Sequence, residues 1–78
     1  MANIKENIIN IIAKMAHQNP SNITGKSRLT QDLGLKSANR IGLSALLEEQ
    51  YRIELTLFDI MSVKTIDDVS SLIQSKLM

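Results

Sequence analysis

One serine stands out because a glycine turn and two basic residues surround it. Ser37 follows Asp32-Leu33-Gly34-Leu35-Lys36, at the predicted start of a helix, and Arg40 lies three positions after it. Each of the other predicted helix starts has a capping residue followed three positions later by an acid: Asn3 and Glu6, Thr56 and Asp59, Thr65 and Asp68. At Ser37 the serine is the predicted cap and the acid is missing. The helix dipole and both cations therefore predict an end suited to an external anion, a phosphate above all.

The sequence gives little support for catalysis or metal binding. Capping alone explains a serine at this position, because serine is a favoured N-cap residue. The single histidine, His17, has no carboxylate or hydroxyl spaced to form a catalytic pair, and cysteine is absent. The sequence contains no nucleophile with its base, no metal-ligand cluster and no phosphate-cradling glycine loop. We therefore expect no enzyme and no metal site.

Size and composition predict one small α-helical domain spanning residues 1–78. The 78 residues are 44% apolar, with one Tyr, one Phe and no Trp, so Ile, Leu, Val, Met and Ala must form the core. Such a core favours helices packed on helices. No apolar run is long enough to span a bilayer, and the N-terminus lacks a secretory signal pattern. We expect a cytoplasmic monomer that does not insert into membranes.

The net charge of +1 is unevenly distributed along the chain. Residues 1–40 contain six Lys/Arg and two acids, giving +4, whereas residues 41–78 contain three Lys/Arg and six acids, giving −3. A basic half sometimes marks nucleic-acid binding, but here the excess is modest and lacks interleaved aromatic residues. The excess of basic residues gathers around Ser37. Nucleic-acid binding is therefore a distant alternative, and we expect no nucleic-acid partner.

Hydrophobic periodicity and capping signals place four helices at about residues 3–18, 37–51, 56–61 and 65–76. Pro20 is expected to stop the first helix, because proline disfavours helical geometry at the preceding residue. The long connection that follows is expected to be held to the core by Leu29, Leu33 and Leu35, with Gly34 at positive φ. The predicted fold class is all-α: a four-helix bundle with a long first loop and a short third helix.

The second helix has two apolar faces where a surface helix needs one. Its core-facing arc is predicted to contain Leu43, Leu46, Leu47 and Tyr51. A second, small apolar strip lies opposite: Ile41 and Ala45, bracketed by Glu48 and Glu49, with Gly42 beside them. We predict that this strip docks a partner. The alternative is a strip without a partner, since isolated exposed apolar residues are common. Glycine inside a helix costs about 1 kcal/mol relative to alanine, and close approach by another molecule is one reason to tolerate it.

Three segments of the chain follow a pattern typical of one protein family: Asp32-Leu33-Gly34-Leu35-Lys36-Ser37, then Leu46-Leu47-Glu48-Glu49-Gln50-Tyr51-Arg52-Ile53-Glu54-Leu55, and Thr65-Ile66-Asp67-Asp68-Val69. Through them the chain resembles the acyl carrier protein family over residues 29–73, without apparent gaps. The resemblance implies that Ser37 is the attachment point for 4′-phosphopantetheine. A phosphopantetheinyl transferase would supply the group from coenzyme A, using Mg²⁺, and the chain would shuttle acyl thioesters between acyl-loading and acyl-processing enzymes of a fatty-acid, polyketide or other specialised pathway.

Further site residues follow from the residue types and, for the acyl pocket, from this family architecture. Lys36 and Arg40 would contact the phosphate. The partner surface would extend from the second helix to exposed apolar residues of the third, namely Leu57, Phe58 and Met61. An acyl chain would enter between the second and third helices, near Leu47, Leu55, Ile60 and Ile66.

The chain also departs from the family pattern. Lys36 replaces the usual Asp before the serine, Ala38 replaces the usual Leu after it, and Asn39 and Gly42 replace acidic residues. These changes predict specialised partners, because like charges facing each other lower affinity and on-rate. They also leave a second interpretation open, in which an unmodified carrier-like module docks proteins through Ile41, Ala45, Leu57, Phe58 and Met61.

Overall fold

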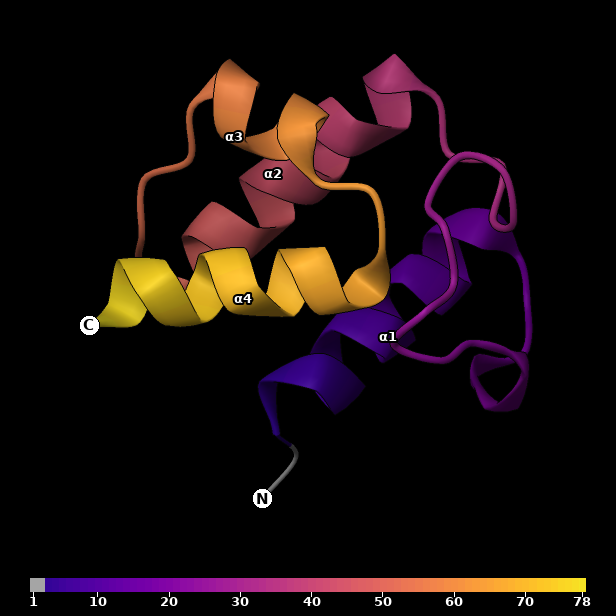
Figure 1. Cartoon of the computed structure of the whole chain (residues 1–78). Coiled ribbons are helices and arrows are strands. Elements are labelled where there is room, and N and C mark those ends of the chain that lie inside the picture. The colour runs from indigo at the N-terminus through magenta and orange to yellow at the C-terminus, as the bar shows by residue number, and fades with distance from the viewer. Residues whose placement is uncertain (1–2) are drawn as a thin grey trace.

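The computed structural model describes residues 3–78 and shows an all-α fold (Figure 1). Its elements are α1 (Ile4–Ala16), a 3₁₀ turn η1 (Pro20–Asn22), α2 (Ser37–Tyr51), α3 (Leu57–Ser62) and α4 (Ile66–Leu77). In Figure 1 the long connection from α1 to α2 runs along one side of the helices, and the short α3 lies beside α2. The predicted fold class, including the long first loop and the short third helix, is confirmed.

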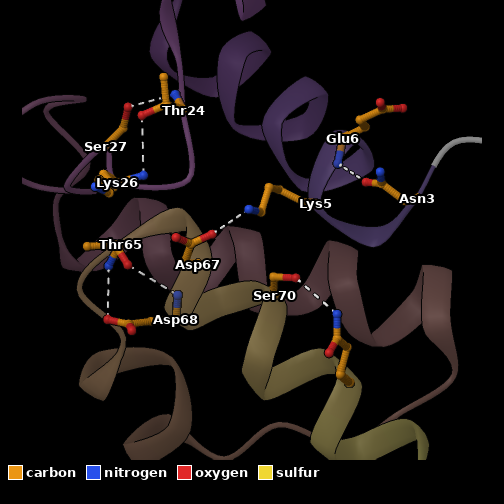
Figure 2. Close-up of polar contacts among 11 residues, drawn as sticks. Asn3, Lys5, Glu6, Thr24, Lys26, Ser27, Thr65, Asp67, Asp68 and Ser70 are labelled. Atoms are coloured by element: carbon orange, nitrogen blue, oxygen red, sulfur yellow. Dashed lines mark hydrogen bonds and ion pairs between the residues drawn. The ribbon is translucent and has the colours of Figure 1, made fainter.

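The starts of α1, α3 and α4 form as their capping signals predict. Asn3 Oδ1 accepts from the Glu6 N–H at 2.8 Å (Figure 2), Thr56 Oγ1 accepts from the Asp59 N–H at 3.0 Å, and Thr65 Oγ1 accepts from the Asp68 N–H at 3.2 Å. Asp59 and Asp68 each accept in return from the N–H of the capping threonine. Each of these reciprocal pairs satisfies two backbone donors that the helix leaves without partners.

The first helix ends earlier than the sequence predicts. It stops at Ala16, and His17 takes a left-handed conformation with φ of 54°, while its N–H donates to carbonyls of the last turn. Pro20 begins the 3₁₀ turn η1, so it lies beyond the helix end that it was expected to cause. A left-handed C-cap closes the last turn without a proline, which explains the difference.

The long connection is held against the start of α4 by backbone hydrogen bonds. The Leu29 N–H donates to the Lys64 carbonyl at 2.9 Å, and the Asp67 N–H donates to the Gly25 carbonyl at 2.9 Å. The Asp67 carboxylate pairs with Lys5 of α1 at 2.8 Å (Figure 2). The loop that leads to Ser37 is therefore fixed to the start of α4, which is itself paired with α1.

One apolar core joins all four helices and the loop. Its largest fully buried side chains are aliphatic: Ile8, Ile12, Leu29, Leu35, Leu43, Leu47, Ile60, Ile66, Val69 and Ile73. Leu29, Leu33 and Leu35 are all buried, so the predicted attachment of the loop to the core is confirmed. Among the helices that residues 3–78 form, none combines the length and the apolar composition needed to cross a membrane.

Candidate functional site

The turn before Ser37 is built by side chains that bond to their own loop. Asp32 Oδ2 accepts from the Arg28 N–H at 2.8 Å, and Asp32 Oδ1 pairs with Arg28 Nη2 at 3.1 Å. The hydrogen bond from the Arg28 side chain is the main reason that the pKa of Asp32 lies below its usual value. The carboxylate nearest to Ser37 in the preceding loop is therefore already paired, and it stabilises the turn.

Gly34 then turns the chain into α2. Its φ of 70° lies in the left-handed region, as the sequence predicts, because only glycine enters that region without a steric cost. The following residue returns to the core: the Leu35 N–H donates to the Leu29 carbonyl at 2.9 Å, and Thr30 Oγ1 donates to the Leu35 carbonyl at 3.0 Å. The backbone conformation leading to Ser37 is thus fixed on both sides of the glycine.

The range of α2 begins at Ser37 as predicted, but its capping residue differs from the predicted one by a single position. Lys36 is the N-cap, with extended backbone, and Ser37 is the first helical residue. The prediction that Ser37 caps α2 is therefore wrong. The Lys36 side chain has no oxygen to accept from the first turn, and Asn39 Oδ1 accepts from the Lys36 N–H at 2.9 Å. An asparagine thus takes the reciprocal place that an acid occupies in α3 and α4, and it adds no negative charge.

Ser37 presents its hydroxyl to solvent at this helix end. Within residues 3–78 its side chain takes part in no hydrogen bond, and the residue is exposed. The first backbone bond of α2 runs from the Arg40 N–H to the Lys36 carbonyl at 3.0 Å, so the amides of residues 37–39 keep their donors free of any acceptor in the described chain. Three free donors, a nearby ammonium and no acid in the first turn fit a phosphodiester on the serine.

Arg40 has structural contacts that its sequence position does not reveal. Its Nη1 donates to the Ile60 carbonyl at 3.1 Å and to the Val63 carbonyl, and its Nη2 donates to Thr30 Oγ1 at 3.3 Å. The guanidinium therefore ties the first turn of α2 to the end of α3 and to the long loop. The phosphate contacts predicted for Lys36 and Arg40 stay predictions.

The predicted partner surface is strongly exposed on two neighbouring helices. Phe58 and Leu57 of α3 are 79% and 62% exposed, and Ile41 of α2 is 54% exposed. Met61, Gly42, Ala45 and Glu49 are exposed as well. Glu48 differs from these residues because it is half-buried and its Oε2 accepts from the Leu55 N–H at 3.0 Å. One of the two predicted docking carboxylates is thus already engaged within the chain.

One residue predicted to lie on the core face of α2 does not lie there. Leu46 is 47% exposed and does not lie in the core with Leu43 and Leu47. It borders an open groove of about 500 Å³ between α1 and α2, lined by Ile11, Lys14, Met15, Leu46, Glu49 and Gln50. The periodicity that placed Leu46 among core residues does not show where a neighbouring helix stops covering the face.

The residues predicted to receive an acyl chain lie in or beside the core. Leu47, Ile60 and Ile66 are almost fully buried, and Leu55 is half-buried against the same cluster. An acyl chain entering here must displace packed side chains. Its entry at this place stays a prediction.

Comparison with known proteins identifies this arrangement. Residues 6–73 match the family described as "Phosphopantetheine attachment site". The fold is also similar to the solution structure of the apo doublet acyl carrier protein from prodigiosin biosynthesis, with a TM-score of 0.77 and 25% sequence identity. That match covers 92% of this chain and 35% of the other, so this chain spans about a third of the length of that protein.

Proposed function

This chain belongs to the phosphopantetheine attachment family, and from that membership we propose that Ser37 carries the group. Proteins of this kind are carriers without catalytic activity, and they hold 4′-phosphopantetheine covalently. The observation that supports Ser37 is its exposed hydroxyl at the first residue of α2, next to three free backbone donors. The bound group supplies a thiol that holds acyl groups as thioesters, a function for which the chain has no cysteine of its own.

The residues around Ser37 have defined parts in this proposal. A phosphopantetheinyl transferase with Mg²⁺ joins Ser37 Oγ to the pyrophosphate phosphorus of coenzyme A that bears the pantetheine. The hydroxyl loses its proton, the P–O bond within the pyrophosphate breaks, and adenosine 3′,5′-bisphosphate leaves. The free amides of residues 37–39 and the Lys36 ammonium then face the negative charge of the phosphodiester. The repulsion between the Asp32 carboxylate and the phosphodiester is weakened, because Arg28 pairs with the carboxylate.

A mass measurement tests the attachment. We expect incubation with coenzyme A, Mg²⁺ and a broad-specificity transferase to add the mass of one phosphopantetheine, with the modified peptide containing Ser37. Ser37→Ala should stay unmodified. Ser71→Ala, at an exposed serine of α4, should be modified like the wild type. A wild-type chain that stays unmodified with several such transferases would contradict the proposal.

We further propose that the chain serves a specialised acyl pathway of the fatty-acid, polyketide or a related type. Carrier proteins in general meet a modifying transferase and acyl-processing enzymes, and the similar solved structure comes from prodigiosin biosynthesis. Specialised partners are supported by the net charge of +1 and by Lys36 beside the serine, because partners with basic surfaces would be repelled there. Side-by-side loading assays with acyl-loading enzymes of the different pathways test this choice.

An alternative function rests on the exposed apolar side chains alone. Phe58, Leu57 and Ile41 form a surface that needs no prosthetic group to bind a protein. If the chain works as an unmodified docking module, Ser37→Ala should bind its partner enzyme as strongly as the modified chain does. If it works as a carrier, the same variant should abolish acyl transfer.

A further inference from the structure

The short helix α3 is held to the bundle by few contacts. Of its six residues only Ile60 is fully buried, while Leu57 and Phe58 are exposed. Asp59, at its first turn, pairs with Lys76 of α4 at 3.1 Å. Its C-terminal end has no ion pair of this kind among residues 3–78. Arg40 of α2 is the charged side chain that meets this end.

The carbonyls at the end of α3 need donors from elsewhere. The Lys64 N–H, which is four residues after Ile60, donates to Asp68 Oδ2 at 2.9 Å and not back to the Ile60 carbonyl. The backbone leaves α3 in an extended conformation at Val63. The Ile60 and Val63 carbonyls both accept from Arg40 Nη1, so a single guanidinium group closes this helix end.

Arg40 is also close to Ser37 in the fold. It is three residues further along α2, which places it on the adjoining part of the same helix surface, one turn away. Its Nη2 reaches Thr30 Oγ1, and Thr30 Oγ1 donates to the Leu35 carbonyl just before the helix. One side chain thus connects the loop before the modified serine, the first turn of α2 and the end of α3.

We propose that Arg40 is a positioning residue that keeps α3 closed on α2, and so controls how readily this side of the bundle opens to an acyl chain. The part concerning the acyl chain rests on the function proposed above. Opening here would expose Ile60 and the neighbouring core residues Leu47 and Ile66, which the closed structure buries. The Arg40 guanidinium meets its acceptors with two nitrogens, Nη1 on the two carbonyls and Nη2 on the hydroxyl. Lysine is one bond shorter and has a single nitrogen, which cannot occupy both places.

Amide hydrogen exchange on the unmodified protein tests the closure and does not depend on Ser37. In Arg40→Gln we expect the α3 amides of residues 60–62 to exchange about tenfold faster, because charge-assisted hydrogen bonds are lost. Amides in α1 should change by less than about twofold. Arg40→Lys should behave like Arg40→Gln. Arg52→Gln is the matched control, because Arg52 is exposed and its side chain makes no hydrogen bond within residues 3–78.

Two results would overturn the closure by Arg40. One is an equal acceleration in all helices, which would indicate a general loss of stability. The other is a wild-type exchange rate for α3 in Arg40→Lys, which would show that the charge matters and the fork does not.

Loading with a medium-length acyl group tests the control of entry. We expect the acyl-induced shifts of the Leu47 and Ile66 methyl groups to be larger in Arg40→Gln than in the wild type. Equal shifts in the two loaded proteins would overturn this part of the inference, even where Ser37 is modified.

Discussion

Several charged side chains of the long loop and of α2 bind the backbone of the protein itself. Asp32 accepts from the Arg28 N–H, Arg40 donates to two carbonyls at the end of α3, and Glu48 accepts from the Leu55 N–H. Each interaction satisfies a backbone group that the helices leave unpaired. The Ser37 hydroxyl, by contrast, is exposed and has no such bond within the described chain. This contrast distinguishes the exposed hydroxyl, which we propose is modified, from side chains that hold the backbone in place.

Asp68 is a residue whose bonding predicts a pH-dependent stability. Its Oδ2 accepts from the N–H groups of Lys64 and Thr65 at 2.9 and 3.2 Å. These bonds, the one from Lys64 first, lower the pKa of Asp68 below its ordinary value of 3.8. Because the pKa is lower in the folded state, the stabilisation is complete above the unfolded pKa and is lost as the pH falls through the folded pKa.

Asp68→Ala should therefore lower the free energy of unfolding by about 1 kcal/mol near neutral pH, the usual cost of losing such a capping pair. The difference from the wild type should shrink once the pH falls below the lowered pKa. Urea unfolding followed by circular dichroism at about pH 7 and about pH 2.5 measures both effects. Glu54→Ala, at an exposed residue, is the control and should change little. A difference that is the same at both pH values would rule out this explanation.

Local signals at the residue scale were predictable from the sequence, and contacts between distant residues were not. The Thr65 and Asp68 pair follows from spacing alone, as does the positive φ of Gly34. The bond from the Lys64 N–H to Asp68 follows less directly, because it depends on how the chain enters the helix. The contacts of Arg40 join residues 20 and 23 positions apart, and no local pattern encodes them.

At the scale of elements, the sequence predicts the bounds of α2 correctly, but it predicts only in part which of its side chains are buried. Its bounds, Ser37–Tyr51, are those expected from periodicity, because the Gly34 turn and the apolar spacing are local features. Its covered surface depends on how α1 crosses it. Near Leu46 the two helices leave an open groove, so a residue of core type lies half exposed.

Gly42 provides a prediction about this helix. A Cβ at this position would meet only Met15 Cε, at 3.9 Å, which is ordinary contact. Gly42→Ala should therefore raise the free energy of unfolding by about 1 kcal/mol, because alanine favours the helix and restricts the unfolded chain. If a partner approaches the backbone here, the same change should slow acyl loading by the partner enzyme.

Gly34→Ala gives the contrasting control for that experiment. No atom lies within 4 Å of a Cβ at Gly34, yet its φ of 70° makes alanine strained, so we expect a loss of about 1 kcal/mol. Urea unfolding of both variants measures the free energy of unfolding, which should rise in Gly42→Ala and fall in Gly34→Ala. Destabilisation by Gly42→Ala would show that the helix at this position does not tolerate a side chain.

Across the whole molecule, the contacts that hold the long loop, α1 and α4 together lie apart from the exposed apolar surface of α2 and α3. The long loop is bonded to the start of α4, and Lys5 and Asp67 join α1 to α4 (Figure 2). Ile41 of α2 and three residues of α3 form an exposed apolar set, namely Leu57, Phe58 and Met61. Arg40 bonds the end of α3 to the first turn of α2, which begins with Ser37. A partner that handles a group on Ser37 would meet this surface first. The sequence predicts a partner surface on the second and third helices, but it does not predict how α3 packs against α2, because that packing depends on contacts between distant residues.

Phe58 tests whether this surface is used. Its 79% exposure means that Phe58→Ala should leave the free energy of unfolding within about 0.5 kcal/mol of the wild type. Loss of a central aromatic contact should nevertheless lower kcat/KM for acyl loading by the partner enzyme about tenfold or more. Leu46→Ala is the matched control, since Leu46 is half exposed but borders the groove between α1 and α2. Partners that approach over α2 and α3 should respond to Phe58→Ala alone, and an equal loss with Leu46→Ala would place their contact on the other side of α2.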